Sequence, residues 1–263
     1  MSNKLDHSLY KRTNYTDSSI SFIENTNIIE YDMKNAGMNI LRTLGYVSND
    51  SKAVLNYDDL INMKKIDRVI TIGKALRNNP KMNEDLENGF EECRRIFMES
   101  NNINKDDILS IKKDAIYVIE KHANNLRIND YIRFEKKNQY DTYISLMEKE
   151  HYININEDII DVKGYSKETI EHHKDYLFKF LLDVVKMNRD MDKIDVAEAL
   201  TIFKHKYVTR SLDKGYYKSL ADNKYMVEFT NSILGIPDIN EMNENISINY
   251  NLTFILEIIN RLM

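Results

Sequence analysis

Two aspartates stand where strand-forming sequence ends or turns. Asp32 follows the apolar run at residues 28–31, and Asp114 interrupts the β-branched run at residues 108–119. A buried carboxylate without a partner is costly, so acids in such surroundings need a cation or a hydrogen-bond donor. If the two strands are neighbours in one sheet, the carboxylates can face each other and bind divalent cations for two-metal phosphoryl transfer.

Both aspartates also have a purely structural interpretation. Aspartate is a common helix N-cap, and Asp32 precedes a sequence that favours a helix. Aspartate is equally common in tight turns, which suits Asp114 between the two apolar halves of a hairpin. The pairing of the strands therefore decides between a site and two local structural roles.

The elements that must position these acids follow from the spacing of apolar residues. We expect a strand at residues 28–31, a turn from Asp32 to Gly37 and a helix beginning near Met38. Helical spacing also predicts helices over residues 66–78 and 84–99, with Pro80 ending the first. The stripe expected to be buried on the first of these helices consists of Ile66, Val69, Ile70, Gly73 and Leu76. On the second, we expect Cys93 to be a small core residue.

Short β-like segments occupy the middle of the chain and give way to helices near Gly164. The predicted hairpin at residues 108–121 is followed by strand-like segments at 131–134, 142–146, 151–155 and 159–162. Helices are expected at 168–187, 196–207 and 252–262. Asp195 and Glu198 predict a capping box before the second of these helices, and Asp58 with Asp59 predicts an earlier N-cap.

Composition narrows the class of protein. With 42% hydrophobic and 30% charged residues in 263, the chain is predicted to be globular, and 7 Gly and 2 Pro are too few for the turns of an all-β sandwich. We expect an α+β fold, in which a small antiparallel sheet with packed helices precedes a helical C-terminal part. The single cysteine excludes an internal disulfide. A polar N-terminus and the lack of a long apolar run predict a cytoplasmic protein that is neither exported nor membrane-spanning.

Charge and motifs exclude several function classes. The net charge of −5 gives no general attraction for nucleic acid. Within residues 201–225, however, basic residues outnumber acids by six to two, and Lys204, Lys206 and Arg210 are candidate nucleic-acid contacts. The alternative for this window is an ordinary solvated helical face. No phosphate-binding glycine loop, serine-hydrolase elbow, dinucleotide fingerprint or zinc-binding histidine pair occurs.

The residues around both aspartates resemble the palm of family-B polynucleotide polymerases. The family's first motif, D-x-x-S-L-Y-P-S-I, is matched by residues 32–40 (DMKNAGMNI), and its last, Y-x-D-T-D-S-I-x-V, by residues 112–118 (KKDAIYV). Residues 70–74 (ITIGK) are similar to the I-T-x-x-G-R helix between them. The resemblance implies that Asp32 and Asp114 bind the catalytic Mg²⁺ or Mn²⁺. Lys112 replaces the less essential acid of the last motif.

Two later segments continue the resemblance in the same order. Residues 136–140 (KKNQY) are similar to the K-K-x-Y segment that contacts primer and template, and residues 161–164 (DVKG) to the K-G turn before the thumb. The nucleic-acid contacts that this implies are Lys136, Lys137, Tyr140, Lys163 and Gly164. The implied domains are an N-terminal arm at 1–27, a palm-like α+β domain at 28–165 and a thumb-like helical subdomain at 166–263.

The chain also departs from the family pattern. The fingers motif, K-x-x-x-N-S-x-Y-G, is matched only by Lys52 and Asn56, with Asp59 and Leu60 in place of Tyr-Gly. Gly37 stands where the family has the tyrosine that excludes a ribose 2′-hydroxyl, which implies poor sugar discrimination. The candidate nucleotide-binding residues are thus Lys52, Asn56, Gly37 and Lys112. The chain has no room for an exonuclease domain.

The sequence therefore predicts template-dependent nucleotidyl transfer by a protein of a phage or mobile element. Its expected partner is nucleic acid, as primer–template or single strand, with Mg²⁺ or Mn²⁺ as cofactor. An alternative is an inactive palm-like module that joins other subunits of a phage replication or transcription complex. A third interpretation, a helical adaptor unrelated to polymerases, would be supported by Asp32 and Asp114 lying far apart.

Overall fold

A computed structural model describes residues 9–221 and 239–263, with side chains from residue 248 onward in the last stretch. The chain forms two compact units. Unit 1 comprises Met1–Ser18 and Asn27–Gln139, and unit 2 comprises Ser19–Thr26 and Tyr140–Met263. The predicted α+β class is confirmed. The division falls after Gln139, whereas the sequence suggested a boundary near 165, because the strands that follow Gln139 pack with the C-terminal helices.

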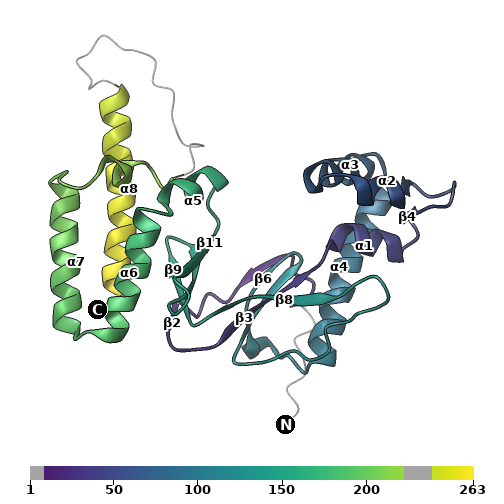
Figure 1. Cartoon of the computed structure of the whole chain (residues 1–263), viewed down its shortest axis with the longest axis horizontal. Coiled ribbons are helices and arrows are strands. Elements are labelled where there is room, and N and C mark those ends of the chain that lie inside the picture. Colours follow the sequence, from purple (N-terminus) through teal and green to yellow (C-terminus); the bar gives the residue numbers. More distant parts are fainter. Residues whose placement is uncertain (1–8, 222–238) are drawn as a thin grey trace. The chain divides into compact units, whose positions relative to one another are not determined.

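Unit 1 is built on a five-stranded sheet in the order β1-β6-β7-β3-β8 (Figure 1). Its strands are β1 (Asn14–Thr16), β3 (Ile28–Met33), β6 (Ile108–Lys112), β7 (Ala115–Ile119) and β8 (Phe134–Tyr140). The pairs β1·β6, β6·β7 and β3·β7 are antiparallel. The first described residues are therefore an added sheet edge, and residues 1–8 of the predicted arm lie outside the described part. The segment predicted as a strand at 131–134 begins its strand only at Phe134.

The β6–β7 hairpin forms as predicted. Lys112 pairs with Ala115, which leaves Lys113 and Asp114 as a two-residue turn. Lys113 adopts a left-handed conformation with φ +47°, as such tight turns require. The long β-branched runs on either side bury β6 and β7, so the turn is held at one end of a rigid ladder.

Helices α1 and α4 form the core of unit 1 with the sheet. The helices and minor strands of this unit are α1 (Ala36–Thr43), β4 (Val47–Ser48), β5 (Leu55–Asn56), α2 (Tyr57–Asn62), α3 (Lys65–Asn78), α4 (Pro80–Ser100) and η1 (Lys105–Asp107). Phe97 of α4 packs against the rings of Tyr31 and Phe134 from two strands, with centroids 5.3 and 4.1 Å away. Cys93 is buried in this core, as predicted, and burial raises the pKa of its thiol to about 11.

Most of the stripe predicted to be buried on α3 is exposed. Ile66, Val69 and Ile70 are 64%, 59% and 47% exposed. Leu76 does pack against the core as predicted, together with Ile72 and Ala75, which the predicted stripe did not include. Since α1 and α4 already cover the sheet, α3 contacts the core through this narrower strip and leaves its other apolar positions exposed.

Unit 2 joins a four-stranded antiparallel sheet, in the order β11-β10-β9-β2, to a group of helices (Figure 1). Its elements are β2 (Phe22–Ile23), β9 (Thr142–Leu146), β10 (Lys149–Asn154), β11 (Ile159–Lys163), α5 (Lys167–His173), α6 (Leu177–Asp190), α7 (Lys193–Val208), η2 (Lys214–Tyr217) and α8 (Ile239–Leu262). Helices α6, α7 and α8 pack side by side around buried Leu181, Val185 and Phe254. Among the described helices, none has the length and apolarity needed to cross a membrane.

Three local helix predictions for this chain need correction. The single helix expected at 168–187 is split into α5 and α6, because Tyr176 leaves the helical conformation with ψ −103°. Helix α7 begins at Lys193, so Asp195 lies in its first turn and does not form the predicted capping box. Likewise α2 is capped by Asn56, whereas Asp58 and Asp59 lie inside its first turn. In both short-range errors the true cap lies two or three residues earlier than expected.

Candidate active site

Asp32 and Asp114 lie on neighbouring strands at the same end of the unit 1 sheet. In the antiparallel β3·β7 pair, Asp32 is opposite Ala115, the residue after Asp114. The backbone N–H of Met33 donates to the Asp114 carbonyl at 2.9 Å. Both aspartates line one cavity of about 630 Å³. The pairing of the two strands counts against the interpretation as a helical adaptor, which a wide separation of the acids would have supported.

The capping interpretation of Asp32 is also wrong. Helix α1 has Asn35 as its N-cap, and Asp32 is the fifth residue of β3, where its backbone belongs to the sheet. Asp114 does occupy a hairpin turn, as the structural alternative proposed. The turn lies at the end of the β6–β7 hairpin, and both of its residues, Lys113 and Asp114, line the cavity.

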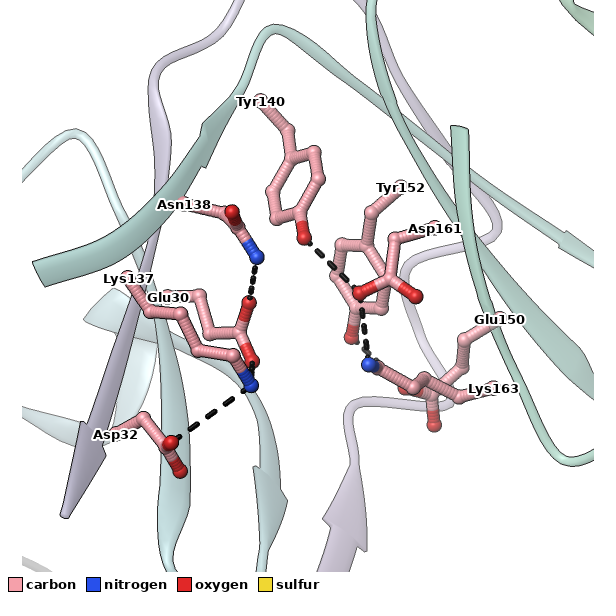
Figure 2. A network of polar contacts seen from close by, with 9 residues as sticks. All are labelled: Glu30, Asp32, Lys137, Asn138, Tyr140, Glu150, Tyr152, Asp161 and Lys163. Carbon is pink, nitrogen blue, oxygen red and sulfur yellow. Dashed lines mark hydrogen bonds and ion pairs between the residues drawn. The ribbon is translucent and has the colours of Figure 1, made fainter. Parts of the chain in front are cut away.

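A buried glutamate organises the charges beside Asp32. Glu30 is only 1% exposed, and its carboxylate accepts hydrogen bonds from Lys137 Nζ at 3.1 Å and Asn138 Nδ2 at 2.6 Å (Figure 2). The same ammonium lies 3.7 Å from Asp32 Oδ2. Burial raises the pKa of Asp32, Lys137 opposes that shift, and the charges of Asp114 and Glu30 add to it. Glu30 and Asp32 thus share the ammonium of Lys137.

The cavity that receives Asp32 and Asp114 carries an excess of positive charge. Its acidic lining residues are Asp32, Asp114 and Glu135, and its basic ones are Lys34, Lys65, Arg68, Lys113, Lys136 and Lys137. The remaining wall is partly apolar and includes Ile72, Leu86 and Phe90. Cations around a pair of carboxylates suit an anionic ligand that brings divalent metal, and the apolar wall suits a flat or apolar part of that ligand.

Arg94 fixes the turn that carries Asp114. Its side chain is 1% exposed, and its guanidinium donates to the Lys113 carbonyl and to the Tyr10 carbonyl, both at 2.7 Å. Burial lowers the pKa of Arg94. The guanidinium thereby ties α4 to the hairpin turn and to the chain before β1, which orients the aspartate without contacting the cavity.

Several residues predicted from the sequence do line this cavity. Gly37, Lys136 and Lys137 are among them. At Gly37 a Cβ atom would meet nothing within 4 Å, so this position leaves open space where the resemblance puts a tyrosine.

The other predicted nucleotide-binding residues do not line it. Lys52 is exposed in the loop before β5, where its backbone N–H donates to Asp50 Oδ1. Asn56 uses its side chain to cap α2, accepting from the Asp59 N–H at 3.0 Å. Lys112 directs its ammonium to Asn14 Oδ1 at 2.9 Å and Thr16 Oγ1 at 3.1 Å on β1. The side chains of Asn56 and Lys112 therefore have local roles.

Three predicted nucleic-acid contacts belong to unit 2. The Tyr140 hydroxyl donates to Asp161 Oδ2 at 3.0 Å, and Lys163 Nζ donates to the same oxygen at 2.7 Å (Figure 2). Gly164 has φ +94°, which explains a glycine in the turn after β11. The structure thus brings Tyr140 and Lys163 together on one carboxylate.

The predicted basic window lies at the end of α7. Lys204, Lys206 and Arg210 are exposed there, in unit 2, and the unit 1 cavity is not built from them. Residues 222–225 of the window lie outside the described residues.

Several residues that line the cavity, and the glutamate beside it, were not predicted from the sequence. Glu30 was detectable as a charge between the apolar residues Ile29 and Tyr31, a pattern that requires a buried partner. Lys65 and Arg68 on α3 are three residues apart and so share one helix face. Lys34 and Lys113 flank the two aspartates in the sequence. Only the fold shows that these cations surround the same space as the acids.

The two aspartates fit a divalent cation. Among the described residues, no group of three or more His, Cys, Asp or Glu side chains could hold a metal by itself. Mg²⁺ in nucleotide-processing sites is usually held by one or two carboxylates together with substrate phosphates. Asp32 and Asp114 supply two carboxylates at one cavity. No described side chain forms a hydrogen bond or ion pair with the Asp114 carboxylate.

Comparisons with known proteins give the chain its family. A search of curated proteins finds no match. The family model described as "Bacteriophage PBS1 gene 130 protein" matches residues 3–263, which supports the predicted phage origin. The chain therefore belongs to the family of the bacteriophage PBS1 gene 130 protein.

Proposed function

We propose that this protein transfers nucleotides to the 3′ end of a primer, directed by a template strand. One observation carries the proposal: the β3·β7 pairing places Asp32 beside Asp114 at a cavity lined by six basic side chains. Two-metal nucleotidyl transfer needs carboxylates at such a point and cations for the triphosphate around them. The sequence resemblance to polymerase palms centres on the same two aspartates.

Each residue has a role that follows from its place. Asp32 and Asp114 would hold Mg²⁺ or Mn²⁺, which when bound lowers the pKa of the primer 3′-hydroxyl and offsets phosphate charge. Lys65, Arg68 and Lys113 line the same cavity and bind the triphosphate. The 3′-oxygen bonds to the α-phosphorus as the bond to the leaving pyrophosphate breaks.

Lys137 has a different position from the other cations. Glu30 fixes its ammonium beside Asp32, so it compensates negative charge before substrate arrives. Lys136 is exposed at the cavity wall and suits the nucleic-acid backbone. Open space at Gly37 favours poor discrimination between deoxyribose and ribose.

A second candidate is an inactive palm-like module of a phage replication or transcription complex. The proximity of the Lys137 ammonium to Asp32 favours it, because a lysine supplies the positive charge that a metal would otherwise bring. The position of Lys52 and Asn56 outside the cavity also favours it.

Primer extension on a labelled template tests the proposal. Wild type would be assayed with dNTPs and with NTPs in Mg²⁺ and in Mn²⁺, beside Asp114→Asn. Loss of a metal ligand should lower the extension rate at least about a thousandfold. Asp158→Asn is the matched control, since Asp158 lies in the turn between β10 and β11 of unit 2.

The outcomes separate the candidates. Extension by wild type and Asp158→Asn, but not by Asp114→Asn, supports nucleotidyl transfer at this site. If folded wild-type protein extends no primer under any condition, the inactive module becomes the better account. If Asp114→Asn retains full activity, the site proposed here is wrong.

A further inference from the structure

A second pocket adjoins the cavity in unit 1. It has a volume of about 560 Å³ and is lined by residues 126–127 and 129–136, from the loop before β8 and the start of that strand. Glu135 and Lys136 line both this side pocket and the cavity. A chain-like ligand in one space can therefore continue into the other along β8.

An aromatic platform stands in the side pocket. The Arg42 guanidinium lies 4.2 Å from the ring centre of Tyr131 and 3.9 Å from that of Tyr57. Tyr131 lines the pocket and is 44% exposed, so one part of its ring is free for a further stacking partner. A planar cation already stacked behind a tyrosine holds the ring in place.

The loop that carries this tyrosine is fixed by its own hydrogen bonds. Asn129 Oδ1 accepts from the backbone N–H groups of Tyr131 at 2.9 Å and Ile132 at 2.8 Å. The N–H of Ile128 donates to the Ile132 carbonyl at 2.9 Å. The ring is therefore presented on a defined turn, which lowers the entropy lost on binding.

Two arginines beside Tyr131 can exchange their present partners for a ligand. Arg127 forms an ion pair with Asp130 at 2.6 Å, and Arg133 forms one with Glu135. All four side chains are exposed, at 41% or more. Exposed ion pairs contribute little to stability, so both guanidinium groups can exchange a carboxylate for a phosphate at small cost.

From these observations we propose that the side pocket binds the single-stranded part of the template, ahead of the primer end. A base stacks on Tyr131 while Arg127 and Arg133 contact phosphates, and the strand enters the cavity past Lys136. Stacking on an aromatic ring with cations along the backbone is how proteins hold single strands without reading sequence. This inference rests on the proposed function, because that function makes the ligand a template.

Fluorescence anisotropy with hairpin primer–templates tests the inference. The probes are one labelled duplex with a 5′ single-stranded overhang, made as DNA and as RNA, and the same duplex with a blunt end. Wild type should bind the overhang probes more tightly than the blunt probe, and this advantage should weaken with salt. Tyr131→Ala and Arg127→Ala should each reduce the overhang advantage, Tyr131→Ala by about tenfold.

Matched variants identify the cause of any loss. Tyr131→Phe keeps the ring and should retain the overhang advantage. Arg95 is another arginine of unit 1 that pairs with an acid three residues away, but it lines neither pocket. The Arg95→Ala variant should therefore bind the probes as wild type does. Thermal melting confirms that each variant is folded.

The results also separate this inference from the proposed function. Equal affinity for overhang and blunt probes, or an overhang advantage that survives Tyr131→Ala, overturns it. An overhang advantage that depends on Tyr131, in a protein that extends no primer, supports the single-strand site and contradicts only the proposed polymerase. The DNA and RNA arms show which strand the pocket favours.

Discussion

Two clusters of carboxylates in this molecule differ in the hydrogen-bond donors that surround them (Figure 2). In unit 2, Asp161 accepts from Tyr140 and Lys163, and the buried Glu150 accepts from the Tyr152 hydroxyl at 2.8 Å. In unit 1, Glu30 accepts hydrogen bonds from Lys137 and Asn138, whereas the Lys137 ammonium lies 3.7 Å from the Asp32 carboxylate.

The difference separates a structural cluster from a candidate site. In unit 2 the protein itself supplies hydrogen-bond donors to the buried Glu150 and the half-buried Asp161. In unit 1 Asp32 and Asp114 face a cavity, and no described side chain forms an ion pair or hydrogen bond with the carboxylate of Asp114. Carboxylates that face a cavity and lack strong protein donors are well suited to bind a ligand that brings cations.

The largest effect is expected from releasing the turn that carries Asp114. Arg94→Met removes the donor to the carbonyls of Tyr10 and Lys113 and should lower the free energy of unfolding by about 3 kcal/mol. Thermal unfolding followed by circular dichroism measures this loss. The neighbouring Arg95 makes exposed ion pairs, so Arg95→Ala should change stability by about 0.5 kcal/mol or less. Equal effects of both variants would contradict the positioning role of Arg94.

The next effect concerns the open wall of the cavity. Gly37→Tyr introduces a ring where a Cβ meets nothing within 4 Å and should increase the preference for dNTPs over NTPs about tenfold. Primer extension with each nucleotide set measures the ratio. Gly73→Tyr is the control, because Gly73 lines the same cavity on α3 and is equally open. It should leave the ratio unchanged, and an equal change in both variants would show mere crowding.

In unit 2, removal of a satisfied charge should destabilise the protein. Asp161→Asn replaces the charged acceptor of Tyr140 and Lys163 with a neutral amide. We expect a loss of about 1 kcal/mol, seen as a decrease in Tm of about 3 °C. An unchanged Tm would mean that this cluster contributes as little as an exposed ion pair.

The same substitution in unit 1 should have the opposite sign. Burial raises the pKa of Asp32 in the folded protein, so stability falls as the pH rises through the window between its unfolded and folded pKa. Above that window the ionised group destabilises the fold. Asp32→Asn should therefore raise Tm at neutral pH by about 2 °C, and this gain should vanish below the window. A decrease in Tm at neutral pH would mean that attraction to Lys137 outweighs burial.

The strand and hairpin that carry the two aspartates were predictable from the sequence, whereas the residues that line the cavity around them were not. The β-branched runs around Asp114 and the apolar run before Asp32 predicted the hairpin and the strand, because local pattern determines both. That the two strands pair is a non-local fact, which no single segment encodes. The same limit explains Lys65 and Arg68, because their helix reaches the cavity through tertiary packing, including its contacts with α4.

Errors concentrated where packing overrides pattern. The apolar positions of α3 look like a buried stripe, yet the sheet is already covered by α1 and α4. Lys52 and Asn56 fit a spacing rule, but Asn56 satisfies the N-terminus of α2 instead. A capping side chain and a ligand-binding side chain have the same residue type, and only the helix boundary distinguishes them.

The most direct test of the contrast between the clusters is Mn²⁺ binding. Electron paramagnetic resonance would follow free Mn²⁺ during titration of wild type, Asp32→Asn, Asp114→Asn and Asp158→Asn, each with a non-hydrolysable nucleoside triphosphate. The account predicts that the two unit 1 variants bind Mn²⁺ at least about tenfold more weakly than wild type, while Asp158→Asn binds it equally well. Equal affinity in all four proteins would contradict a metal site at Asp32 and Asp114.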